Sequence, residues 1–201
     1  MAFAAGAVGC AALPPFHILP FVVVSYVILV WLLDGACEGL PGLPTGPLVA
    51  SRKRAVRALE IGWFFGFGQL LVGLYWISNA LLVDSQAFGW AVPLAAGALP
   101  AALAVFPALG IAAAGFFWSA GVGRIFVLAI AWTVAEWLRG HAFTGFPWNL
   151  IGYVWVEVDP VRQGAALMGI YGVGLLTVFI AASPATLAGV GFRHRGPWGL
   201  V

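Results

Sequence analysis

Five long apolar runs dominate this sequence and leave little alternative to a bundle of membrane-spanning helices. They cover residues 19–33, 58–82, 90–119, 125–138 and 164–190. Hydrophobic residues make up 63% of the chain and charged residues only 8%, whereas a soluble domain carries about 25% charged residues. So much apolar surface has to face lipid, where a helix satisfies its own backbone hydrogen bonds. The sequence therefore predicts an all-α, polytopic transmembrane protein.

The lengths of the runs predict about six helices. A bilayer core of about 30 Å needs about 20 helical residues, and the runs at 58, 90 and 164 exceed that length. The other two runs are shorter, and residues 1–13 predict a further short helix. The chain ends in GPWGLV, where Pro197 suits the first position of a helix. We therefore interpret the sequence as a fragment, truncated before a seventh helix.

The basic residues predict the orientation of these helices. They cluster in three places, at Arg52, Lys53, Arg54 and Arg57, at Arg124, and at Arg193 and Arg195. By the positive-inside rule, these segments face the cytoplasm. Counting the crossings then places residues 83–89 and 139–163 outside and the N-terminus inside. We therefore expect a multi-pass protein with a cytoplasmic N-terminus.

One outer segment, WLRGHAFTGFPWNLIGY at residues 137–153, combines polar and aromatic residues. Trp and Tyr favour the headgroup level of a membrane, and Pro147 prevents simple continuation of the preceding helix. The segment predicts a re-entrant or interfacial loop. Together with Trp76 and Asn79, near the outer end of an earlier helix, it could line one site.

Glu136 and Arg139 lie three residues apart, so both can lie on one helix face and pair. Two interpretations stay open: the pair anchors the loop, or it faces a substrate, as ionisable residues at membrane depth often do. His141 could serve acid–base chemistry or simply be solvated at the headgroup level. Gly62 and Gly66 form a small-residue pair typical of close helix packing. The candidate substrate-facing or lipid-facing residues are Trp76, Asn79, Glu136, Arg139, His141, Thr144, Phe146, Trp148, Asn149 and Tyr153.

No residue pattern indicates a catalytic centre within this chain. There is no GxSxG or HExxH motif, and Cys10 and Cys37 lie far from any His or Asp cluster. We therefore expect no metal, no cofactor and no catalytic residue here. The net charge of +2, without a basic run among aromatic residues, argues against a nucleic-acid partner.

Four segments carry a family resemblance: LPPFHILPFVVVSYVILVWLLDG, GWFFGFGQLLVGLYWISNALL, AEWLRGHAFTGFPWNLIGY and ALMGIYGVGLLTVFIA. The chain resembles the N-terminal membrane region of bacterial apolipoprotein N-acyltransferases. This resemblance implies an inner-membrane enzyme for the final step of lipoprotein biosynthesis. Such an enzyme transfers a fatty acyl chain from a phospholipid, through a Cys thioester, to the α-amino group of the diacylglyceryl-cysteine that begins a lipoprotein.

The resemblance also implies what the chain lacks. The family's Glu, Lys and Cys triad belongs to a periplasmic nitrilase-like domain inserted after a seventh helix, and neither Cys10 nor Cys37 matches the nucleophile. Residues 1–201 would then be the N-terminal membrane domain, inactive on its own. The family's outer-face motif matches at Glu136, Arg139, Thr144, Gly145, Phe146, Pro147 and Trp148, and we expect this segment to form the membrane side of the active site.

Two alternatives stay open on the sequence alone. Pro93, Pro100 and Pro107 recur every seven residues and predict a bent helix, which would suit a non-enzymatic transporter or a lipid-handling subunit. The chain could also supply the membrane part to a separately encoded nitrilase-like partner.

Overall fold

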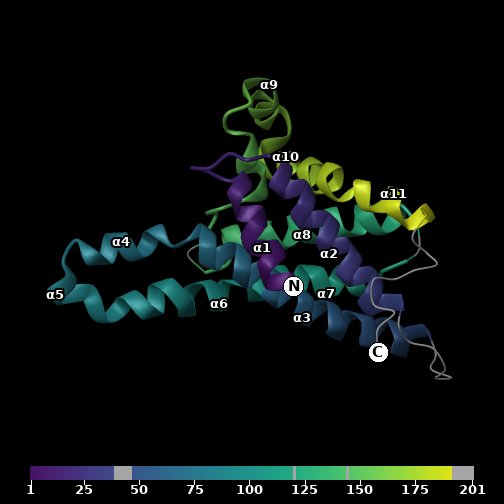
Figure 1. Ribbon diagram of the computed structural model, residues 1–201, viewed down its shortest axis with the longest axis horizontal. Helices are drawn as coiled ribbons and strands as arrows, with labels where there is room; N and C mark the ends of the chain where they lie inside the picture. Colours follow the sequence, from purple (N-terminus) through teal and green to yellow (C-terminus); the bar gives the residue numbers. More distant parts are fainter. Residues whose placement is uncertain (39–46, 120, 144, 192–201) are drawn as a thin grey trace.

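The computed structural model describes residues 1–38, 47–119, 121–143 and 145–191, and all regular elements in these ranges are helical (Figure 1). The first half contains α1 (Ala2–Gly9), η1 (Cys10–Ala12), α2 (Pro20–Glu38), α3 (Pro47–Gly73), α4 (Trp76–Leu82), α5 (Ser85–Phe88) and η2 (Gly89–Ala91). The second half contains the π-helical turn η3 (Leu94–Ala98), α6 (Leu99–Leu103), α7 (Val105–Phe116), α8 (Gly123–His141), η4 (Ile151–Trp155), α9 (Asp159–Gln163), α10 (Ala165–Ala182) and α11 (Pro184–Gly191). The predicted all-α fold is confirmed. Thr144, Arg193, Arg195 and the expected start of a seventh helix lie outside the described residues.

Four helical stretches among the described residues are long and apolar enough to cross a membrane. They are Pro20–Cys37, Leu48–Gly73, Ser85–Phe116 and Ala165–Leu187. The helix expected at 19–33 is therefore longer than its apolar run. The helix expected at 1–13 forms as α1 and η1, and at about 1.5–2 Å per residue it is about half as long as a bilayer core. α8 (Gly123–His141) is of similar length but carries the charged residues Arg124, Glu136 and Arg139, and it is not among those four.

Prolines break the run expected at 90–119, as their spacing predicts. The π-helical turn η3 follows Pro93 directly, and α6 ends at Leu103 just before α7 begins. Since proline removes a backbone donor and its ring clashes with the preceding turn, these are the positions where a helix must deform.

Each main helix packs against the next around the bundle, and the last of them contacts the first. α3 packs against α1 and α7, α7 against α8, α8 against α10, and α10 against α2, which in turn contacts α1 and α3. The contact between α3 and α7 is especially close at Gly62 and Gly66. A Cβ at Gly62 would lie 2.9 Å from the Cα of Ala108, and a Cβ at Gly66 would overlap Pro107. The packing role predicted for the two glycines is therefore confirmed.

An ion pair joins three helices at one end of the bundle. The Arg124 side chain at the start of α8 contacts the carboxylate of Asp34 in α2, with 3.0 Å between Arg124 Nε and Asp34 Oδ1. Trp118, just after α7, donates its indole N–H to the same oxygen at 2.9 Å. The ends of α2, α7 and α8 are thereby fixed relative to one another.

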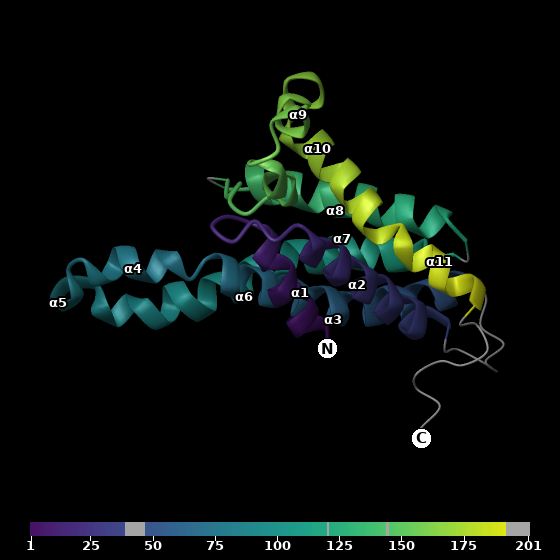
Figure 2. The same cartoon turned by 45° about the horizontal axis from the view of Figure 1, so that its top comes forward.

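At the opposite end, α4, α5, η2, η3 and α6 form a helical hairpin that extends away from the other helices in both views (Figures 1 and 2). None of the residues in α4, α5, η2 or η3 is buried. Val83 and Trp90 are 88% and 72% exposed. A mostly apolar hairpin without protein cover is suited to contact with lipid.

We expect Gly62→Ala to destabilise the bundle by about 1–3 kcal/mol, because the added methyl overpacks the contact between α3 and α7. The measurement is the free energy of unfolding in mixed detergent micelles, followed by circular dichroism. Gly35→Ala in α2 is the matched control, since its Cβ would have no neighbour within 4 Å. The control should gain about 0.5–1 kcal/mol from the lower entropy of the unfolded chain. Equal effects of the two variants would contradict the packing argument.

Candidate functional site

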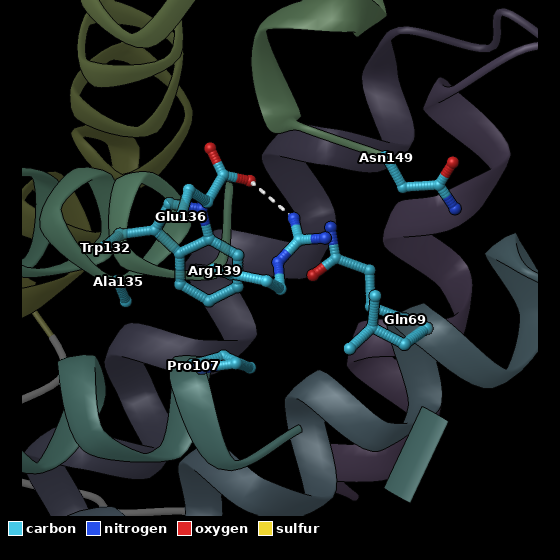
Figure 3. A pocket seen from close by; sticks show the side chains of 8 residues that line it. Gln69, Pro107, Trp132, Ala135, Glu136, Arg139 and Asn149 are labelled. Carbon is cyan, nitrogen blue, oxygen red and sulfur yellow. Dashed lines mark ion pairs between the residues drawn. The ribbon is translucent and has the colours of Figure 1, made fainter. Parts of the chain in front are cut away.

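The last two turns of α8 direct two charged side chains into the bundle. Glu136 and Arg139 are only 5% and 4% exposed. Arg139 Nη2 lies 3.9 Å from Glu136 Oε1, so the pair predicted from the three-residue spacing forms (Figure 3).

Both side chains bind the backbone of the segment that follows α8. Arg139 Nη1 donates to the carbonyl oxygens of Phe146 and Trp148, at 3.0 and 2.7 Å. Glu136 Oε1 accepts the N–H of Ile151 at 2.9 Å. The pair therefore clamps residues 146–151 at both ends. This geometry corresponds to the anchoring interpretation of the pair.

The chain folds back over α8 through residues that tolerate unusual backbone angles. Phe143, Gly145 and Asn149 have φ angles of 55°, 77° and 53°. Glycine adopts positive φ without strain, and asparagine more readily than most residues. A Cβ at Gly145 would also overlap the carbonyl oxygen of Gly140. The non-helical segment predicted around Pro147 is thus confirmed, and it leads into η4.

The clamped segment presents aromatic rings next to the start of α4. The ring centroids of Trp148 and Trp76 lie 5.3 Å apart, and Phe146 lies 6.4 Å from Trp148. Trp148 is 51% exposed and Trp76 39%. We call Trp76, Phe146 and Trp148 the aromatic patch. It brings together residues that are more than 70 positions apart in the sequence.

Below the clamp lies a small pocket (Figure 3). It is lined by Gln69, Leu70, Pro107, Trp132, Ala135, Glu136, Arg139 and Asn149. Its cavity volume of about 10 Å³ is room for about one water molecule. An acyl chain does not fit there, so any lipid has to bind on the exposed side of the clamped segment or elsewhere.

The remaining candidates occupy different surroundings. Asn79 is exposed in α4, Tyr153 is 38% exposed in η4, and Asn149 lines the small pocket. His141 lies two residues after Arg139 and therefore on nearly the opposite side of α8. Its ring stacks on Trp137 at 4.6 Å. The structure thus separates His141 from the pocket that holds Glu136 and Arg139.

Sequence reasoning missed two residues around the clamp, Trp132 and Gly174. Trp132 is 2% exposed and lines the pocket one turn before Glu136, a spacing that could have indicated it. Gly174 in α10 allows a close approach, because a Cβ there would lie 3.3 Å from Ile151 and 3.6 Å from Glu136. Nothing local in the sequence indicates that contact. Among the described residues, no three His, Cys, Asp or Glu side chains gather as a metal site would require.

We expect Arg139→Met to destabilise the protein by about 3–5 kcal/mol, because it leaves the Glu136 carboxylate buried without its cation. Arg162→Met is the matched control, since Arg162 pairs with Asp159 at the same three-residue spacing but both side chains are more than half exposed. Such a surface pair contributes about 0–1 kcal/mol. Unfolding free energies in detergent micelles provide the comparison, and similar losses for both variants would contradict a buried clamp.

Comparison with known proteins shows the family of this chain. A family model described as the apolipoprotein N-acyltransferase N-terminal domain matches residues 5–183. The chain is 49% identical over 187 residues to an apolipoprotein N-acyltransferase from Agrobacterium fabrum, covering 93% of this chain and 34% of that relative. It is 46% identical over 195 residues to the enzyme of that name from Brucella suis, covering 97% of this chain and 35% of the relative. The chain spans about a third of the length of these relatives. With its apolar helices and its match to the N-terminal domain, this chain is a membrane protein that belongs to the apolipoprotein N-acyltransferase family.

Proposed function

We propose that this chain is the membrane domain of an apolipoprotein N-acyltransferase, the enzyme of the final step of lipoprotein biosynthesis. The whole enzyme would take a fatty acyl chain from a phospholipid onto a Cys thiolate and pass it to the α-amino group of a diacylglyceryl-cysteine. Splitting the transfer through a thioester replaces one difficult step with two easier ones. The triad would lie in a nitrilase-like domain within the rest of the protein.

The observation that carries the proposal is the clamp of Glu136 and Arg139 beneath an exposed aromatic patch. Because Arg139 binds the backbone carbonyl of Trp148, the backbone that carries the exposed indole is held in place. The patch contains no ionisable side chain, so it suits the positioning of acyl chains rather than a proton transfer. Cys10 and Cys37 are buried, at 5% and 9% exposure, and neither suits a thioester-forming nucleophile. The isolated chain is therefore expected to be inactive.

The lengths of the helices support an approach of the phospholipid to the clamped segment from within the membrane. Arg124 and Arg139 are separated along α8 by about 22 Å, less than the core of about 30 Å. By contrast, α3 and α4 extend for about 37 Å from Arg57 to Leu82. The clamped segment then lies below the tip of the hairpin, at a depth that the acyl chains of an outer-leaflet phospholipid can reach.

We propose a location in the bacterial inner membrane by the family resemblance, and the charge distribution supports an orientation with the N-terminus in the cytoplasm. Arg52 and Lys53 lie in the second turn of α3, and Arg57 one turn later donates to the carbonyl of Ala36, close to the pair of Asp34 and Arg124. Glu157 and Asp159 lie on the opposite side, near the clamped segment. By the positive-inside rule, the aromatic patch would then face the periplasm. Its partners would be the phospholipid donor, the diacylglyceryl lipoprotein and the catalytic domain.

We expect Trp148→Ala to slow acyl transfer about tenfold, which corresponds to about 1.4 kcal/mol of lost transition-state positioning. The assay uses a chimaera in which this chain replaces the matching third of the Agrobacterium fabrum relative. Trp31→Ala in α2 is the matched control, because Trp31 is 50% exposed and Trp148 is 51% exposed. The rate of transfer from a labelled phospholipid to a diacylglyceryl peptide is measured. Unchanged rates for Trp148→Ala and for Arg139→Met would contradict the proposed role of the clamped segment.

The orientation is tested by cysteine labelling in intact spheroplasts, after replacement of Cys10 and Cys37 by alanine. Glu157→Cys should react with a membrane-impermeant maleimide added from outside, whereas Arg52→Cys should react only after the membrane is opened. Both positions are exposed in the fold, so access depends on the side of the membrane alone. The reverse pattern would invert the proposed topology.

A further inference from the structure

The guanidinium of Arg139 has more hydrogen-bond donors than the clamp uses. A guanidinium carries five N–H groups, and the bonds to the carbonyls of Phe146 and Trp148 both come from Nη1. Nη2 lies 3.9 Å from Glu136 Oε1, which is too long for a direct hydrogen bond. Within the described part of the chain, Nε and Nη2 therefore make no hydrogen bond.

Two further polar side chains line the same small pocket. Gln69 of α3 is 5% exposed, and its side chain makes no hydrogen bond to any residue that the structure describes. Figure 3 shows the amide of Gln69 directed toward the guanidinium of Arg139. The indole N–H of Trp132 is also buried without a partner among the described residues. Such groups are costly at membrane depth, because no bulk water reaches them there.

The pocket between these groups has the size of one water molecule. Its cavity volume is about 10 Å³, and a buried water needs about 10–15 Å³ and two to four polar partners. A bridging water is the usual occupant where two polar groups lie more than about 3.5 Å apart. A metal cation is disfavoured beside the positive charge of Arg139, and larger ligands exceed the volume. A water could accept from Arg139 Nη2 while it binds Glu136 Oε1 and the amide of Gln69.

We infer that the small pocket is a binding site for one structural water, held by Arg139, Glu136 and Gln69, and that Gln69 is thereby a positioning residue for the aromatic patch. The water site concerns the folded chain alone. The positioning role rests on the proposed function, because it requires the patch to take part in acyl transfer.

The water would connect the supports of the two tryptophans in the patch. Trp76 begins α4 seven positions after Gln69, at the outer end of the same helical arm. Trp148 belongs to the segment whose backbone Arg139 binds. Since α3 and α8 each pack against α7, a polar bridge from Gln69 to Arg139 adds a link that this packing does not supply. The 5.3 Å contact between the rings of Trp76 and Trp148 then depends on the bridge.

The water site is tested by a crystal structure of the chain in a lipidic mesophase, at a resolution that shows ordered waters. One peak of density is expected about 2.7–3.2 Å from both Arg139 Nη2 and the amide of Gln69. Gln69→Met, which keeps the length of the side chain without its polar atoms, should weaken or abolish the peak. Gln163→Met, at an exposed position in α9, is the matched control and should retain it. A pocket without density, or a direct hydrogen bond between Gln69 and Arg139, would overturn the inference.

The positioning role is tested in the acyl-transfer chimaera by combining two substitutions. Gln69→Met should slow transfer about fivefold, the rate equivalent of one hydrogen bond, whereas Gln163→Met should leave the rate unchanged. Added to Trp148→Ala, Gln69→Met should have no further effect, because the ring that it positions is already absent. A further fivefold loss in the double variant would show that Gln69 does not act through Trp148.

The two experiments separate this inference from the proposed function. A chimaera without any acyl transfer would contradict the proposed function and with it the positioning role of Gln69. The density in the pocket requires no acyl transfer, so it decides the water site by itself.

Discussion

The buried guanidinium of Arg139 is the constraint on which the rest of this site depends. A charge at 4% exposure is costly unless it is paired and its N–H donors are used. Glu136 supplies the countercharge, and the carbonyls of Phe146 and Trp148 accept from Nη1. These partners exist only if the chain turns back directly after α8. The cost of the buried charge is therefore what specifies the path of the loop, and with it the position of the aromatic patch.

Local patterns in the sequence predicted the parts of this arrangement that depend on neighbouring residues. The apolar runs predicted the helices, and the three-residue spacing predicted the pair of Glu136 and Arg139. Pro147 and the neighbouring glycines predicted the loop after α8. The contact between Trp76 and Trp148 and the close approach of Gly174 to Ile151 could not be predicted. They arise because α7 packs between α3 and α8 and because η4 packs against α10, and no periodicity within one helix indicates which helix is its neighbour.

The same limit explains why the roles of Glu136 and Arg139 stayed open on the sequence alone. An ionisable residue in an apolar helix indicates a functional site when its side chain faces a substrate. It indicates a structural role when its side chain binds the backbone. Only the hydrogen bonds decide between these cases, and here they lead to Phe146, Trp148 and Ile151. The aromatic rings of Trp76 and Trp148, rather than the buried charges, then form the exposed surface of this part of the protein.

Helix geometry lets α8 serve two surfaces at once. Residues two positions apart point in nearly opposite directions, so Arg139 binds the clamped segment while the exposed ring of His141 stacks on Trp137. Any shift of α8 would change both surfaces together. Asp34 and Trp118 oppose such a shift by binding Arg124 or its partner at the far end of the helix. A helix fixed at both ends by charged groups is a rigid support, so the clamped segment and the aromatic patch that it carries keep one position relative to the bundle.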